Sequence, residues 1–194
     1  GAVDLRGIGV NKMPLALEGD WFVHANRFVG PQDPDYPKPD LILKNPEDLV
    51  GLPYGKELTL GPKDTATLSM RLRVSDPGMG HQWALLLPRS YSSSRWVIHG
   101  RDEDGTAISS KSLSLGNVAD EQLNIKPSRE DGYLVFSFHG FVDVGVELAN
   151  RHSHRLGIER LPVFGTFEQL QVLRLKYVIW NAALIGLLLV IGLY

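Results

Sequence analysis

The sequence predicts an all-β domain, a jelly-roll β-sandwich, followed by a C-terminal helix that enters the membrane. The first observation is residues 65–74, where apolar and polar side chains alternate strictly, as in a half-buried strand. The second is the recurrence of Gly, Pro, Asn and Asp turn signals between short apolar runs across residues 1–165. The third is the absence of any charged side chain in residues 177–194.

Several strands are predicted from this alternation. In residues 65–74 the even positions are apolar, and Thr67, Ser69, Arg71 and Arg73 lie on the other face. Residues 142–148 and 134–138 repeat the pattern, and shorter strands are predicted at 18–23, 83–87, 95–99, 106–110 and 122–125. Turn signals lie at 76–78, 104–105, 116–117 and 131–132. Many short strands at this spacing are typical of a sandwich.

Residues 30–62 differ from the rest because they hold most of the 12 prolines. Pro31, Pro34, Pro37 and Pro39 fall within ten residues of one another. Proline has no backbone N–H to donate to a sheet ladder, so a central strand is excluded here. We expect a long ordered loop that wraps the sandwich.

From Thr166 the period becomes helical. Thr166 is a suitable N-cap, and Phe167, Leu170, Leu173 and Tyr177 form an apolar stripe. We expect an amphipathic juxtamembrane helix over 166–176 that continues into a transmembrane helix over 177–194. That stretch is slightly short for a span, so we expect it to be truncated at Tyr194. The alternative is a buried core helix or a helix that packs against another subunit.

The composition excludes several classes of function. The 194 residues suit one domain, and 20 basic against 22 acidic residues give a net charge of −2, so we expect no nucleic-acid partner. The absence of cysteine excludes disulfides and thiolate chemistry. Nucleophile-elbow, phosphate-loop and zinc-protease motifs are also absent from the sequence. We therefore expect no enzyme activity and no cofactor.

One candidate ligand site lies in residues 90–96, Ser-Tyr-Ser-Ser-Ser-Arg-Trp. Carbohydrate sites combine an aromatic ring with planar polar groups, because sugar faces are apolar and sugar edges need directional hydrogen bonds. We select Tyr91, Ser93 and Arg95, with His99 further along the same predicted strand. The alternative is a serine-rich turn, and for Trp96 and Trp21 we favour the core.

A second candidate lies in residues 152–155, His-Ser-His-Arg, which follow a predicted strand. His152 and Arg155 could hydrogen-bond a sugar or a carboxylate. Two histidines on one face could also share a metal, but only Glu159 lies nearby to complete a ligand set. We favour a polar loop and expect no metal site.

The end of the chain, from Asn150 onward, resembles a junction in bacterial seven-transmembrane receptors with diverse intracellular signalling modules. The matching positions are Asn150, His152, Gly157, Gly165 and the final Gly-Leu-Tyr. Residues 17–21 resemble the Leu-x-Gly-x-Trp opening of galactose-binding-like sandwiches. Residues 94–100 resemble a family strand that ends in Asn-Gly, with His99 in place of Asn.

The resemblance implies a galactose-binding-like sensor domain, residues 1–165, anchored in the bacterial inner membrane with residues 1–176 in the periplasm. The leading hypothesis is a ligand-binding domain of a signalling receptor that takes a small molecule or carbohydrate. Its partners would be membrane lipid around 177–194 and a protein partner or a second copy. The alternatives are a membrane-anchored subunit or scaffold without signalling output, and a carbohydrate-binding module of an enzyme.

Overall fold

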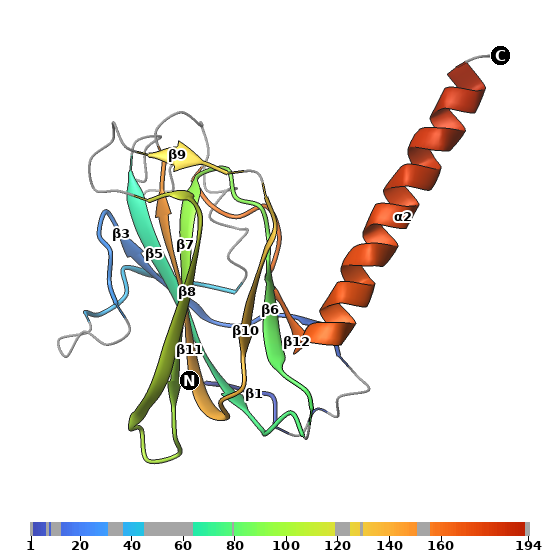
Figure 1. Cartoon of the computed structure of the whole chain (residues 1–194). Coiled ribbons are helices and arrows are strands. Elements are labelled where there is room, and N and C mark those ends of the chain that lie inside the picture. The colour runs from blue at the N-terminus through green and yellow to red at the C-terminus, as the bar shows by residue number, and fades with distance from the viewer. Residues whose placement is uncertain are drawn as a thin grey trace.

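The computed structural model describes residues 2–6, 8, 13–30, 37–44, 64–78, 80–118, 125–128, 130–150 and 156–192. In these residues two β-sheets pack face to face, and one long helix leaves the sandwich at its C-terminal end (Figure 1). The predicted fold class, an all-β sandwich followed by a C-terminal apolar helix, is confirmed.

The larger sheet has eight strands in the order β4-β3-β5-β11-β7-β8-β9, with β1 paired parallel to β5. Their bounds are β1 (Val3–Asp4), β3 (Trp21–Ala25), β4 (Leu41–Leu43), β5 (Thr65–Val74), β7 (Ser93–Arg101), β8 (Ala107–Asn117), β9 (Lys126–Pro127) and β11 (Gly140–Ala149). The long strands β5, β11 and β7 lie side by side at its centre and pair antiparallel over most of their length.

The smaller sheet has the order β10-β6-β12-β2. Its strands are β2 (Leu15–Ala16), β6 (Trp83–Leu87), β10 (Gly132–Phe136) and β12 (Val163–Thr166). Successive strands alternate between the two sheets, as β5, β6 and β7 do and again as β10, β11 and β12 do. This crossing between sheets is the jelly-roll type of connection.

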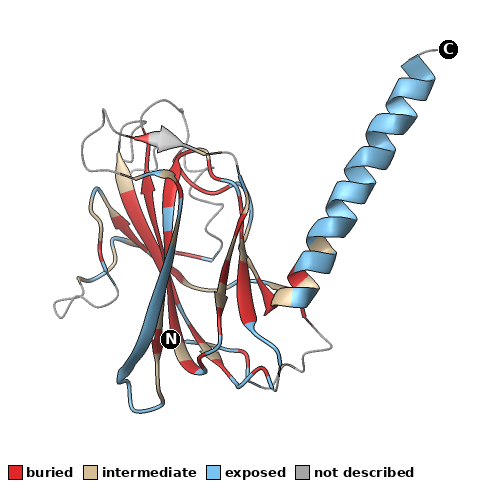
Figure 2. Cartoon of the chain, viewed as in Figure 1, coloured by how far each residue is buried: buried red, intermediate tan, exposed pale blue. Residues whose placement is uncertain are grey.

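Buried residues gather between the two sheets (Figure 2). This core is rich in aromatic side chains. Trp21 and Trp96 are fully buried there, which confirms their predicted place in the core. The indole N–H of Trp21 donates to the carbonyl oxygen of Leu17 at 3.2 Å, so burial does not leave that donor unpaired. Phe136 lies 4.8 Å from Phe138, centroid to centroid.

Most predicted strands are present, and β5 and β6 have the predicted bounds. Two expectations need correction. Part of the proline-rich segment is not loop: the three residues Leu41–Leu43, which include no proline, form β4 at the edge of the sheet. The turn predicted at 116–117 is the end of β8, where Gly116 has a φ of +90°. The strand predicted at 122–125 lies almost wholly outside the described residues.

The C-terminal helix α2 (Phe167–Gly192) starts directly after β12. Thr166 and Gln169 cap its first turn reciprocally: the Gln169 N–H donates to Thr166 Oγ1 at 3.4 Å, and the Thr166 N–H donates to Gln169 Oε1 at 3.2 Å. Leu170 is the residue of α2 that is buried in the sandwich. Beyond this first part α2 runs away from the domain (Figures 1 and 2).

From Tyr177 onward α2 has no charged side chain and is exposed, which excludes a core helix within this domain. Trp180 is 75% exposed, and Leu188 is 59% exposed. The helix has 26 residues, so it is about 39 Å long. Its mean hydropathy in the most apolar window is 1.9, and by length and composition it could span a membrane.

Candidate ligand-binding face

The outer face of the larger sheet carries charged side chains because its central strands alternate. β5 directs Met70 and Leu72 into the core and Arg71 to the outer face. β11 directs Val142 and Val144 inward and Asp143 outward. The pairing of the two strands places Asp143 directly opposite Arg71, so these two side chains meet on the outer face.

Asp143 joins two arginines from its two neighbouring strands. Arg71 on β5 donates to its carboxylate through Nε at 2.5 Å and through Nη2 at 3.0 Å. Arg101 on β7 donates through Nε to Oδ2 at 3.1 Å. The Asp143 side chain is 6% exposed and the Arg71 side chain is 50% exposed. The carboxylate is therefore buried and paired, while the Arg71 side chain that holds it is half exposed.

A second ion pair lies further along the same strands. Arg95 on β7 stands opposite Glu147 on β11, and its Nε donates to Oε2 at 2.5 Å. The Arg95 side chain is 44% exposed and that of Glu147 is 11% exposed. The outer face therefore repeats one arrangement, a buried carboxylate that holds a partly exposed guanidinium.

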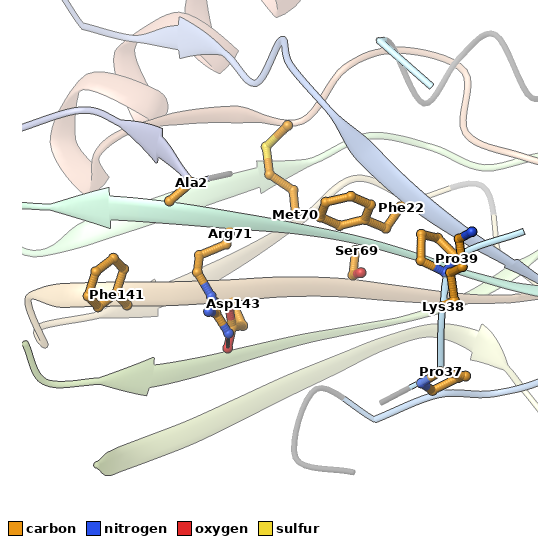
Figure 3. A pocket seen from close by; sticks show the side chains of 10 residues that line it. All are labelled: Ala2, Phe22, Pro37, Lys38, Pro39, Ser69, Met70, Arg71, Phe141 and Asp143. Atoms are coloured by element: carbon orange, nitrogen blue, oxygen red, sulfur yellow. Dashed lines mark hydrogen bonds and ion pairs between the residues drawn. The ribbon is translucent and has the colours of Figure 1, made fainter. Parts of the chain in front are cut away.

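A hollow of about 640 Å³ lies on this face beside Arg71 and Asp143 (Figure 3). Phe141 and Phe22 contribute aromatic rings to its lining, from β11 and β3. Residues Pro37, Lys38 and Pro39 of the proline-rich segment form another wall. The hollow thus combines apolar rings with the exposed edge of an ion pair.

A shallower hollow of about 350 Å³ lies over β7 and β8 on the same face. Its lining includes Arg95, His99, Ser110, Ser112 and Glu147. His99 also stands opposite Asp143 in the pairing of β7 with β11, so this hollow adjoins the Asp143 cluster. The two hollows are therefore neighbours on one surface.

The pKa of His99 is lowered from its ordinary value because burial disfavours the imidazolium. The Asp143 carboxylate opposes this effect, and the Arg101 guanidinium adds to it. His99 is therefore neutral at pH 7, and a neutral imidazole offers one hydrogen-bond donor and one acceptor.

The structure separates the residues predicted from sequence. Arg95 and His99 lie together in the shallower hollow. Ser93 begins the same strand but is fully buried. Tyr91 lies in the connection before β7, where its N–H donates to the Gly157 carbonyl at 3.1 Å, and it lines neither hollow.

The other predicted residues, His152 and Arg155, lie outside the described residues. Among the residues that are described, no group of three His, Asp or Glu side chains is placed to hold a metal ion. Sequence reasoning missed Arg71, Asp143 and Phe141 as site residues, because only the strand pairing brings them together.

Comparison with known proteins gives no family: no family model matches the chain, and no curated protein matches it. One similar solved structure is a β-glucuronidase of Faecalibacterium prausnitzii, 13% identical with a TM-score of 0.46, covering 78% of this chain and 31% of that one. Another is the apo form of Bacteroides uniformis β-glucuronidase 3, 10% identical with a TM-score of 0.44, covering 80% and 22%. The chain spans less than a third of either enzyme, and a likeness at this level assigns it no activity.

Proposed function

We propose that this chain is the non-catalytic ligand-binding domain of a membrane-anchored signalling receptor, and that it takes a carbohydrate-like ligand on the outer face of the larger sheet. One observation carries the proposal. The Arg71–Asp143–Arg101 cluster lies beside a hollow that Phe22 and Phe141 line.

The chemistry of this face suits a polyhydroxylated ring. The faces of a sugar ring carry C–H groups that pack on aromatic rings such as that of Phe141, and its hydroxyls need directional partners. The half-exposed side chains of Arg71 and Arg95 end in planar groups of donors, and buried carboxylates hold these side chains in place. An acidic sugar would gain an additional ion pair with either arginine.

The anchoring part of the proposal places residues 1–176 in the periplasm and α2 in the bacterial inner membrane. It is supported by the exposed apolar length of α2 and by the likeness of the chain end to receptor junctions. Because α2 follows β12 without a linker, a movement of the small sheet would move the helix. A ligand can drive such a movement only by its differential affinity for two conformations.

The proposal is tested by thermal unfolding of the full chain in detergent micelles against a library of neutral and acidic saccharides. A ligand that binds the folded state raises the melting temperature by mass action. We expect at least one class of saccharide to raise it in a concentration-dependent manner. If no saccharide in the library raises the melting temperature, the result contradicts carbohydrate recognition and favours a scaffold or subunit role.

A further inference from the structure

A third hollow, of about 580 Å³, lies at the junction of α2 with the small sheet, far from the outer face of the larger sheet. Residues of α2 and residues in or next to the strands of the small sheet both line it. Arg89 follows β6, Arg160 precedes β12, and Arg174, Tyr177 and Asn181 lie on successive turns of α2. We call this the junction hollow.

The junction hollow carries an excess of positive charge. Its described lining contains three guanidiniums and a single carboxylate, that of Asp131. Arg89 Nε and Arg160 Nη2 each lie 3.7 Å from Asp131 Oδ1. This distance is too long for a hydrogen bond, so Asp131 attracts both arginines without occupying their N–H donors. Both arginine side chains are about half exposed, at 51% and 52%.

Aromatic rings position two of these guanidiniums. The Arg160 Cζ lies 6.0 Å from the ring centroid of Tyr177, and the Arg174 Cζ lies 5.5 Å from that of Tyr133. A cation over a ring face is held without using its in-plane N–H groups. The arginines therefore present planar forks of donors, the geometry that binds phosphate in a bidentate manner.

The junction hollow also lies where α2 becomes apolar. Tyr177 is the first residue of the charge-free stretch, and Val178 and Asn181 line the hollow from within that stretch. A helix that enters a bilayer here brings its first apolar turns to the level of the lipid headgroups. Anionic headgroups attract basic residues beside a span.

We propose that the junction hollow binds the phosphate of an anionic phospholipid and so holds the sandwich against the bilayer surface. The proposal rests on the proposed function in one respect, that α2 spans a membrane. Soluble phosphate offers the same chemistry. The lipid is the better occupant because one wall of the hollow belongs to the apolar part of α2.

Trp180 makes a direct test feasible. It is 75% exposed and lies within the α2 segment that lines the hollow, whereas Trp21, Trp83 and Trp96 are at most 2% exposed. Brominated acyl chains quench tryptophan on contact, so they report the lipids around Trp180. The full chain is reconstituted into phosphatidylcholine vesicles with phosphatidylglycerol as the minor lipid. Bromine is placed on one lipid or the other at equal mole fraction, and Trp180→Phe identifies the signal of this residue.

We expect brominated phosphatidylglycerol to quench Trp180 more strongly than brominated phosphatidylcholine. Each basic group beside a bilayer contributes about fivefold to the local preference for anionic lipid. The Arg89→Gln/Arg160→Gln variant should therefore lose the preference by fivefold or more. Arg6→Gln, at an exposed position in the turn that follows β1, should retain it. Should the double variant unfold, Arg174→Gln is a second variant, because the Arg174 side chain has no carboxylate partner in the described part of the chain and packs on Tyr133 instead.

Equal quenching by the two lipids would overturn the proposal. A second result would also overturn it. If 10 mM inorganic phosphate, added to the chain in pure phosphatidylcholine vesicles, raises the melting temperature as much as phosphatidylglycerol does, the site belongs to a soluble anion. Absence of quenching even in vesicles of brominated phosphatidylcholine alone would overturn the membrane span, and the lipid site with it. The two failures are distinguishable: equal quenching by the two lipids leaves the membrane span intact and overturns only the lipid site, whereas no quenching overturns both.

Discussion

Asp143 and Arg71 face each other across the β11–β5 pairing, and two hydrogen bonds of 2.5 Å and 3.0 Å join the carboxylate to the guanidinium. Arg101 approaches the same carboxylate from the other side. A buried carboxylate needs such partners, because desolvation without pairing is costly. This cluster fixes the polar side of the hollow that Phe141 and Phe22 line.

Asp143→Ala should lower the free energy of unfolding by about 1.5–3 kcal/mol, because hydrogen bonds to charged groups contribute this much and two guanidiniums lose their shared partner. The predicted loss of free energy is modest because the half-exposed Arg71 side chain can turn into solvent when Asp143 is removed. Chemical denaturation measures the loss. Asp104→Ala, the same substitution in an exposed turn, is the control and should change stability little. Equal effects of the two substitutions would show that the cluster does not stabilise the sheet.

Stability should fall as the pH drops below about 6.5, the ordinary pKa of histidine. Burial lowers the folded-state pKa of both His99 and His24, so the unfolded chain binds more protons in the window below 6.5. Their contribution is complete above 6.5 and is lost as the pH falls through the folded values. Thermal unfolding between pH 7.5 and pH 5 measures this effect. His99→Gln should flatten the dependence, and an unchanged slope would contradict the burial argument for His99.

The attachment of α2 should depend on Leu170. This side chain is fully buried, whereas Leu175 on the same helix is 58% exposed. Leu170→Ala should lower the unfolding free energy by about 2–4 kcal/mol through lost burial and a residual cavity. Leu175→Ala makes the same chemical change in an exposed place and should have little effect. Differential scanning calorimetry of the two variants in identical micelles compares them directly, and equal melting temperatures would contradict the packing seen here.

The sequence has no cysteine, so single engineered cysteines can report membrane topology. Ser109→Cys lies on exposed β8, and Leu188→Cys lies within α2. In bacterial cells with a permeabilised outer membrane, an impermeant maleimide should label the first variant and not the second. Labelling of Ser109→Cys only after lysis of the inner membrane would place the sandwich in the cytoplasm. Rapid labelling of Leu188→Cys would show that α2 does not span.

Local sequence patterns were sufficient for much of the fold. The alternation of residues 65–74 defines β5, and Thr166 marks the start of α2, because both depend on neighbours in the chain. The Asp143 cluster could not be predicted in the same way. Arg71, Arg101 and Asp143 lie on three strands, and only the sheet order β5-β11-β7 and its register bring them together.

The ligand-site residues predicted from sequence show the same dependence on how the chain folds. Arg95 is predicted as part of the polar and aromatic stretch 90–96, and His99 lies further along the same strand; the even spacing of the two residues on β7 places both on the outer face. Tyr91 was selected for its closeness in sequence to Arg95, but the chain turns between them. Strand β4 was missed because the prolines around it indicate a loop, and an edge position tolerates them.

The location of the ligand site tests the central claim most directly. Isothermal titration of the saccharide that stabilises the chain most should compare the wild type with Phe141→Ala, Arg71→Gln and the control Leu175→Ala. We predict affinity about tenfold or more weaker for the first two variants, which corresponds to about 1.4 kcal/mol each, and unchanged affinity for the control. Binding of all three variants with wild-type affinity would show that the outer face of the larger sheet is not the ligand site.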